Sequence, residues 1–281
     1  MTTIAITGAS GHLGGSLARR LAELSPRLVV RDASRAPDID GTEVAVTAYG
    51  DLKAARSALA GVTTLFLVSA AESAQRREEH RTMVRAALEA GVRQVVYTSF
   101  VGAGTDAAFT LARDHGDTEE ALRESGLATT ILRDNFYLDV LPHFADEHGV
   151  IRGPAGEGRV AAVARADVVA AAETVLRDPD AHAGETYELT GPEAITFAEV
   201  ATRAGRVLGR GLTFADQSLE EAYATRRAAY PDAPDWQLDA WVSTYTAIRD
   251  GACARLSDDV RLLTGRRPSS LERALLGTDT A

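Results

Sequence analysis

The chain opens with an apolar strand that runs directly into a glycine-rich turn, and this feature constrains its fold most. Residues 3–15 read Thr-Ile-Ala-Ile-Thr-Gly-Ala-Ser-Gly-His-Leu-Gly-Gly, which spaces Gly8, Gly11 and Gly14 as G-x-x-G-x-x-G. In such a unit the first glycine permits a tight turn, the second lets backbone approach a pyrophosphate, and the third lets the helix pack on the strand. Leucines at helical spacing follow. The sequence therefore predicts a phosphate-binding turn at the start of a helix.

Strand and helix signals alternate through the rest of the first half. Strand candidates are short apolar or β-branched runs: Ile4–Thr7, Leu28–Arg31, Val44–Thr47, Thr64–Val68, Gln94–Thr98 and Thr129–Leu132. Helix candidates lie between them: Leu13–Leu24, Leu52–Leu59, Gln75–Ala90 and Asp114–Glu124. Such alternation is typical of βαβ units, whose strands are buried on both faces. We therefore expect an α/β fold with a Rossmann-type, doubly wound parallel sheet.

The regular alternation fades after about residue 150. A glycine-rich loop covers residues 153–158, a helix is expected over Asp167–Arg177 with Asp167 as its cap, and Tyr187–Thr190 is a short strand candidate. Three or four helices then follow. We expect residues 1–150 to form a Rossmann domain that binds NAD(P), and residues 151–281 to form a smaller, mostly helical lobe on the substrate side, with the chain crossing back to the sheet edge.

Composition excludes several classes of function. The net charge is −10, shared equally between residues 1–150 and 151–281, so neither part is basic enough to bind nucleic acid. No apolar run is long enough to span a membrane, and the first strand begins too early for a signal peptide. The single Cys253 is expected to be a small buried residue, and no Cys/His spacing indicates a metal site. We expect a cytoplasmic protein.

The residues after the second strand bear on which nucleotide binds. An acidic side chain at this position bonds a ribose 2′-hydroxyl, whereas an Arg accommodates a 2′-phosphate. The chain offers Arg31 and then Asp32, with Ser34 and Arg35 following. The residue at the strand end faces the ribose, and the next usually turns outward. The pattern favours NADPH held by Arg31 and Arg35. NADH is the alternative, with both arginines as solvated loop charges.

Two further strand ends complete the expected cofactor site. Asp51 follows the third strand, as a helix cap that also meets the adenine side of the site. The fourth strand ends in Ser69-Ala70-Ala71, whose small side chains would let the nicotinamide ribose lie against backbone.

An ordered set of motifs resembles one known family. The motifs are Thr7-Gly8-Ala9-Ser10-Gly11-His12-Leu13-Gly14, Tyr49-Gly50-Asp51, Tyr97-Thr98-Ser99, His115-x-x-Thr118-Glu119, Leu132-Arg133-x-Asn135-x-Tyr137, Arg165-Ala166-Asp167 and Tyr187-Glu188-Leu189-Thr190-Gly191-Pro192. The set covers nearly the whole chain. It resembles the NmrA-like group of atypical short-chain dehydrogenases, and within it the type 2 NAD(P)H:quinone oxidoreductases and triphenylmethane reductases.

The resemblance implies a Rossmann domain that binds NADPH, a small C-terminal lobe and a cleft between them. Residue pattern and resemblance together assign cofactor contacts to Gly8, Ser10, Gly11, His12, Leu13, Gly14, Arg31, Arg35, Asp51, Ser69, Ala70, Ala71 and Ser99. The resemblance adds Asn135, Phe136 and Tyr137, which would line the nicotinamide and substrate cleft, and Arg165 in the loop under it. Related chains often carry Gln at position 12 and Asn at position 32, where this chain has His12 and Asp32.

Short-chain dehydrogenases usually protonate a reduced carbonyl with a Tyr, assisted by a Lys four residues later. Tyr49 and Lys53 have that spacing, but they follow the third strand, on the adenine side. Alignment on Glu119 instead places His115 at the Lys position and Leu111 at the Tyr position. We expect no Tyr-Lys dyad, with a His that can change charge near neutral pH in place of the fixed cation.

An acceptor that delocalises an incoming hydride needs little protonation, so the chain is expected to be an NADPH-dependent oxidoreductase for quinone-like or extended aromatic acceptors. Tyr137 or His115 could donate a proton or orient the acceptor, although His115 could equally have no chemical role. Phe100, Phe136, Tyr137, Phe144 and Trp236 could wall a flat pocket. The alternatives are an NADP(H)-sensing regulator without turnover and a tailoring enzyme for one aromatic natural product. A homodimer is left open.

Overall fold

The computed structural model describes residues 3–277, whose contacts divide into two compact units. The first unit comprises the described residues up to 105, with 114–133 and 168–187. The second comprises 106–113, 134–167 and the described residues from 188. The units interleave along the chain, so the contacts do not divide at one point near residue 150. The division into residues 1–150 and 151–281 stays a prediction.

The central sheet has seven strands in the order β3-β2-β1-β4-β5-β6-β8. They are β1 (Ile4–Thr7), β2 (Arg27–Val30), β3 (Val44–Val46), β4 (Thr64–Leu67), β5 (Gln94–Phe100), β6 (Ala128–Asp134) and β8 (Thr186–Leu189). β1 pairs in parallel with β2 and with β4, and β2–β3 and β4–β5 are parallel too. The predicted doubly wound parallel sheet is confirmed, because the order reverses direction at β1.

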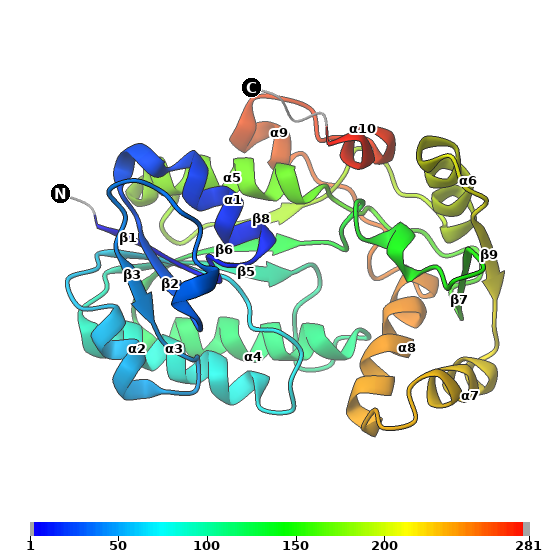
Figure 1. The fold of residues 1–281 in the computed structure, drawn as a ribbon, viewed down its shortest axis with the longest axis horizontal. Helices are drawn as coiled ribbons and strands as arrows, with labels where there is room; N and C mark the ends of the chain where they lie inside the picture. Colours follow the sequence, from blue (N-terminus) through cyan, green and yellow to red (C-terminus); the bar gives the residue numbers. More distant parts are fainter. Residues whose placement is uncertain (1–2, 278–281) are drawn as a thin grey trace. The chain divides into compact units, whose positions relative to one another are not determined.

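Helices flank the sheet, and Figure 1 shows α1 and α5 on one face and α2, α3 and α4 on the other. They are α1 (His12–Arg20), α2 (Leu52–Ala58), α3 (Arg76–Ala90), α4 (Thr110–Ser125) and α5 (Arg165–Arg177). Short 3₁₀ turns cover η1 (Ala22–Leu24), η2 (Ala33–Arg35) and η4 (Pro179–His182). The first predicted helix is shorter than expected, because its last turn is the separate turn η1.

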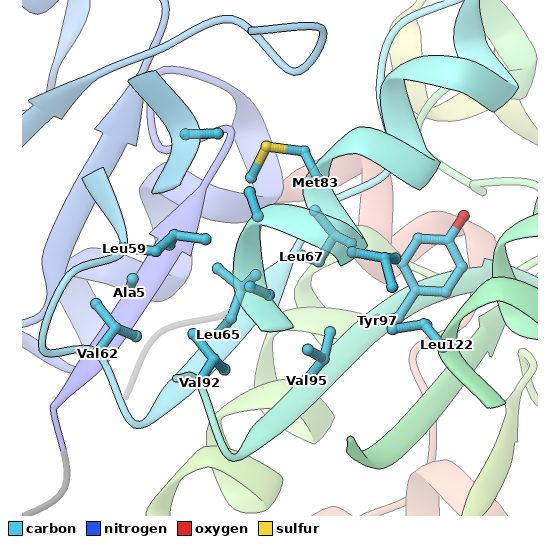
Figure 2. Close-up of a cluster of buried hydrophobic side chains, with 14 of the residues drawn as sticks. Ala5, Leu59, Val62, Leu65, Leu67, Met83, Val92, Val95, Tyr97 and Leu122 are labelled. Carbon is cyan, nitrogen blue, oxygen red and sulfur yellow. The ribbon is translucent and has the colours of Figure 1, made fainter. Parts of the chain in front are cut away.

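The core of the first unit lies between the sheet and the helices α2, α3 and α4 (Figure 2). Its fully buried members include Leu59 just after α2, Met83 on α3, Tyr97 on β5 and Leu122 on α4. Burying one such aliphatic side chain contributes about 1.5–3 kcal/mol to folding. This packing fixes the carboxyl ends of the strands, where the loops of the site begin.

The second unit holds a short strand pair that the sequence did not predict. β7 (Val150–Gly153) pairs in parallel with β9 (Thr213–Asp216). The remaining elements are η3 (Leu141–Phe144), α6 (Phe197–Leu208), α7 (Leu219–Ala229), α8 (Asp235–Arg249), α9 (Asp259–Thr264) and α10 (Leu271–Leu276). Phe197 stacks on Phe214 and on Tyr245, with ring centroids 5.6 and 5.0 Å apart. The unit is therefore mostly helical around an aromatic core.

The predicted cap of α5 is wrong. The helix begins at Arg165, so Asp167 lies within its first turn. The buried Asp167 carboxylate instead accepts a hydrogen bond of 2.6 Å from the backbone N–H of Ser269 and lies 2.7 Å from the Arg266 guanidinium. The Asp167 side chain, which was predicted to cap its own helix, therefore binds a segment about one hundred residues further along the chain.

Among the described residues, no helix combines the length and apolarity that crossing a bilayer requires.

Candidate active site

A cavity of about 490 Å³ opens in the first unit at the carboxyl ends of β1, β2 and β4. This is the edge at which doubly wound sheets bind their ligands. Its lining is Gly8, Ser10, Gly11, Val29, Val30, Arg31, Arg35, Thr47, Ala48, Tyr49, Val68, Ser69, Ala70, Ala71, Glu72, Ser73 and Glu79. Eight of the predicted cofactor contacts lie here: Gly8, Ser10, Gly11, Arg31, Arg35, Ser69, Ala70 and Ala71.

The glycine turn has the geometry that its spacing predicts. Gly8 has a φ of +60°, and a Cβ there would lie 3.2 Å from the Cβ of Val68. A Cβ on Gly14 would lie 2.5 Å from the carbonyl oxygen of Gly8, so only glycine lets α1 approach the turn this closely. No side chain in the described part of the chain caps α1, and the first turn of this helix has no acidic residue. The helix start thus fits a phosphate group.

The charged residues after β2 point in the directions that the sequence predicts: the arginines face the cavity and the aspartate does not. The exposed Arg31 and Arg35 line the cavity. Asp32 does not, because its carboxylate accepts hydrogen bonds from the backbone N–H and the hydroxyl of Ser34 at 2.9 and 2.7 Å. These bonds lower the pKa of Asp32 and keep its carboxylate in the turn η2. The side of the cavity near β2 is therefore lined by guanidinium groups.

Tyr49 lines the cavity, although it was not among the predicted cofactor contacts and stood only in a family motif and in a rejected dyad. Its hydroxyl donates to the carbonyl of Val68 at 2.6 Å and lies 2.6 Å from the Thr7 hydroxyl. Burial raises its pKa well above the usual value, while Lys53 is exposed. Tyr49 therefore ties the ends of β1 and β4 together. Its position just after a strand was the signal that could have placed it in the cavity.

The loop after β4 is held by two buried side chains that the sequence analysis missed. The backbone N–H of Ala70 donates to Nε2 of His80 at 2.8 Å, and the carbonyl of Ala70 accepts from Nε of Arg76 at 2.9 Å. His80 and Arg76 lie one turn apart on α3 and are 0% and 5% exposed. Burial, reinforced by the charge of Arg76, lowers the pKa of His80 to about 3, so the ring accepts this bond as a neutral group.

His115 belongs to the same buried network. Nη2 of Arg76 lies 3.0 Å from Nε2 of His115, and Nδ1 of His115 lies 2.9 Å from the hydroxyl of Tyr97. A guanidinium only donates, so Nε2 accepts and Nδ1 carries the proton. Burial, and then the charge of Arg76, lower the pKa of His115 well below its usual value. The expectation of a cation that switches near neutral pH is therefore wrong, because the ring is neutral there.

The other predicted contacts of the first unit do not line the cavity. His12, Leu13 and Gly14 form the first turn of α1. Asp51 caps α2 by accepting from the N–H of Ala54 at 2.9 Å. Ser99 donates its hydroxyl to Glu119 at 2.5 Å, and Arg133 pairs with the same carboxylate. The cap at Asp51 is confirmed, and the cofactor roles of these five residues stay predictions.

Asn135, Phe136, Tyr137 and Arg165 lie in the second unit. The amide of Asn135 donates to the carbonyl of Cys253 at 2.9 Å and accepts from the N–H of Phe136 at 2.8 Å. Nε of Arg165 lies 2.5 Å from the Asp139 carboxylate. Cys253 is buried, as expected, and burial raises its pKa to about 12. The segment after β6 is therefore held by bonds to Cys253 and Arg165 as well as by the bond within it.

Asp134 is the most unusual ionisable group of this segment, and no motif indicated it. Asp134 is 2% exposed, and its carboxyl group accepts a hydrogen bond from the hydroxyl of Tyr137, while its Oδ1 has no hydrogen-bond partner among residues 3–277. Burial raises the pKa of Asp134 to about 7, and burial together with Asp134 raises that of Tyr137 well above its usual value. The pair can therefore hold one extra proton at neutral pH.

The aromatic residues expected to wall one flat pocket are spread over both units. Phe100 lies in the first unit, with its ring 6.3 Å from that of His115. Phe136 packs against Phe109 in the second unit, with centroids 5.1 Å apart, and Phe144 lines a separate cavity of that unit. A common wall for these side chains stays a prediction.

A family model described as NAD(P)H-binding matches residues 8–179. The chain belongs to this family. It is 35% identical to quinone oxidoreductase 2 of Escherichia coli over 270 residues, which are 93% of this chain and 92% of the relative. It is 31% identical to an NAD(P)H azoreductase of Xenophilus azovorans over 271 residues, 94% and 93% of the two chains.

A solved structure of similar fold is the NADPH-dependent quinone oxidoreductase of Escherichia coli in complex with NADPH. The two structures superimpose with a TM-score of 0.87 at 32% sequence identity. The alignment covers 99% of this chain and 100% of the other chain. The match to an NAD(P)H-binding family thus agrees with the structure, which has a seven-stranded parallel sheet and a glycine turn after its first strand.

Proposed function

We propose that the protein is an NADPH-dependent reductase that transfers a hydride to a quinone-like or extended aromatic acceptor. One observation carries the choice of NADPH: Arg31 and Arg35 line the cavity, while the Asp32 carboxylate is bonded to Ser34 and points no charge into it. A 2′-phosphate needs cationic partners, whereas a ribose hydroxyl needs the carboxylate. The names of the relatives, quinone oxidoreductase and azoreductase, support the acceptor class.

The proposal includes reduction without a Tyr-Lys dyad. The hydroxyl of Tyr49 donates to the backbone of Val68, and Lys53 is exposed, so this pair has the spacing but not the environment of a catalytic dyad. Leu111 offers no proton, and His115 is neutral with both ring nitrogens bonded. When bound, NADPH supplies the hydride, and the chain contributes mainly proximity and orientation, which are worth several kcal/mol.

Asp134 and Tyr137 are the proposed source of the proton. A quinone that receives a hydride becomes a hydroquinone only when it also receives one proton. The hydroxyl proton of Tyr137 points to Asp134 in the described structure. When Asp134 is protonated, it can donate to the oxygen of Tyr137, which frees the tyrosine hydroxyl to donate to the acceptor. Tyr137 is then the proton donor and Asp134 resupplies it, while His115 keeps Arg76 and Tyr97 in place.

NADPH oxidation measured with benzoquinones, naphthoquinones, azo dyes and triarylmethane dyes tests the function, with NADH measured in parallel. We expect turnover with at least one acceptor and a clear preference for NADPH. Tight binding of NADPH without turnover of any acceptor would contradict the reductase and favour a protein that senses the dinucleotide. Absence of binding of either coenzyme would contradict the cofactor site itself.

A further inference from the structure

The second unit contains a cavity of its own, which the proposed reaction does not use. Its volume is about 330 Å³, and it lies among η3, β7, α7 and α8. Pockets for small molecules range upward from about 300 Å³, so it suits a ligand of one or two rings. Its lining is His143, Phe144, Ala145, Asp146, Val150, Arg152, Thr225, Arg226, Ala229, Tyr230, Trp241, Thr244 and Tyr245. All of these residues belong to the second unit.

Aromatic rings form much of the cavity wall. The rings of Tyr230 and Trp241 lie 4.9 Å apart between centroids, and those of Phe144 and Tyr245 lie 6.1 Å apart. Tyr245 is 3% exposed, whereas Tyr230 is 55% exposed. The wall thus runs from the aromatic core to a ring that faces solvent. Flat rings pack best against such surfaces, because offset stacking and edge contacts add to the area they bury.

The charge of the lining is positive although the chain carries a net charge of −10. Of its one carboxylate and two guanidinium groups, Asp146 pairs with Arg152, which leaves Arg226. Nη2 of Arg226 donates to the carbonyl of Arg152 at 3.0 Å, and its Cζ lies 5.4 Å from the ring centroid of Tyr245. In the described part of the chain, this half-buried guanidinium forms no ion pair with a carboxylate. The cavity therefore presents one cation without a counter-ion beside aromatic rings.

We propose that this cavity binds a planar aromatic anion, such as an aryl carboxylate or sulfonate, with its ring against Trp241 and Tyr230 and its acidic group on Arg226. A neutral aromatic molecule would fill the space but leave Arg226 without a counter-ion. A guanidinium recognises such groups well, because it donates two parallel hydrogen bonds to a carboxylate. The site is independent of the proposed reduction, since its lining includes neither Asp134 nor Tyr137 and shares no residue with the cavity at the carboxyl ends of β1, β2 and β4.

Tryptophan fluorescence reports binding directly. Trp236 and Trp241 are the two tryptophans of the chain, so Trp236→Phe leaves Trp241, in the cavity wall, as the single emitter. The probes are 4-nitrobenzoate and 4-nitrobenzyl alcohol, which share a quenching ring and differ in charge. The titration contains no NADPH, so its result does not depend on turnover. We expect 4-nitrobenzoate to bind about tenfold more tightly than the alcohol, as a hydrogen-bonded charge pair allows.

Two variants separate Arg226 from its neighbour. Arg226→Gln should abolish the preference for the acid. Arg227→Gln should preserve it, because Arg227 is exposed and pairs with Asp235 at 2.9 Å outside the cavity lining. Added salt should weaken the binding of 4-nitrobenzoate to the protein with Arg226 intact and leave the binding of 4-nitrobenzyl alcohol unchanged. This test does not depend on how the two arginine variants fold. Equal affinities for the two probes, no quenching by either, or equal losses in the two variants would each overturn the proposal.

Discussion

Nε of Arg76 donates a hydrogen bond of 2.9 Å to the carbonyl oxygen of Ala70. Ala70 lines the cavity of the first unit, and its N–H donates to His80 at the same time. Both polar groups of one cavity residue are thus bonded to buried side chains of α3. Because the small side chain of Ala70 cannot fix the loop, its position depends on these two backbone bonds.

Replacement of Arg76 should therefore damage both stability and cofactor binding. Arg76→Gln removes the bond to Ala70 and the contact of 3.4 Å with Asp114. We expect a loss of about 2–4 kcal/mol in the free energy of unfolding, because buried polar groups lose their partners. The dissociation constant of NADPH should rise as well. Arg85→Gln on the same helix is the control, since that exposed residue pairs with Glu89 at the surface, and such pairs are worth under about 1 kcal/mol.

Urea denaturation and calorimetric titration measure the two effects. A loss of stability with unchanged NADPH affinity in Arg76→Gln would show that the clamp on Ala70 does not position the cofactor loop.

Removal of Arg31 should change the preference between the two coenzymes. Arg31→Ala takes away a cavity guanidinium, so the dissociation constant of NADPH should rise about tenfold or more while that of NADH changes little. The measurement is a titration of each coenzyme by calorimetry. Arg56→Ala is the matched control, because that arginine is exposed on α2 and does not line the cavity. Equal losses for both coenzymes would contradict a role at the 2′-phosphate.

A methyl group at Gly14 should close the phosphate site. Its Cβ would lie 2.5 Å from the carbonyl oxygen of Gly8, so Gly14→Ala forces α1 away from the turn. We expect binding of NADPH and of NADH to weaken together, at least tenfold, because the turn serves the part that both coenzymes share. Gly211→Ala is the control, since a Cβ there meets open space. Unchanged affinity in Gly14→Ala, measured by the same titration, would place the phosphates elsewhere.

The sequence predicted the parts of the fold that repeat a local pattern. The buried strands β1 and β4 are apolar and are followed by residues of the cavity, so both the strands and the site residues Gly8 and Ser69 could be predicted. The pair β7 and β9 was missed because each strand includes a charged residue, unlike the uncharged, mostly apolar runs of β1 and β4. Their pairing also joins residues about sixty positions apart.

The supporting residues of the site were harder to predict for a different reason. Arg76 and His80 bond to backbone atoms, which leave no trace in the sequence of the loop they hold. Their spacing of four residues on a helix that packs on the sheet was the available signal, because it placed two polar side chains on one turn of the buried face. Asp134 was missed because a carboxylate at the end of a strand is usually exposed.

Asp134 should make both stability and activity depend on pH. Its pKa is raised from an ordinary value near 4 to about 7, so the folded state favours the protonated form. Its stabilising contribution is present below the unfolded pKa and is lost as the pH rises through about 7. We expect the melting temperature of the parent protein to fall, relative to that of Asp134→Asn, between pH 5 and pH 8.

The same titration should appear in turnover. If the protonated carboxyl resupplies Tyr137, kcat for a quinone falls as the pH rises above 7, whereas Asp134→Asn has a lower kcat that is flat over this range. Tyr137→Phe should also have a low, flat profile, because it lacks the donor hydroxyl. The exposed Asp106 lies in the same unit, and Asp106→Asn should keep the parent profile. A parent profile that persists in Asp134→Asn would remove Asp134 from the proton path, and one that persists in Tyr137→Phe would remove the tyrosine.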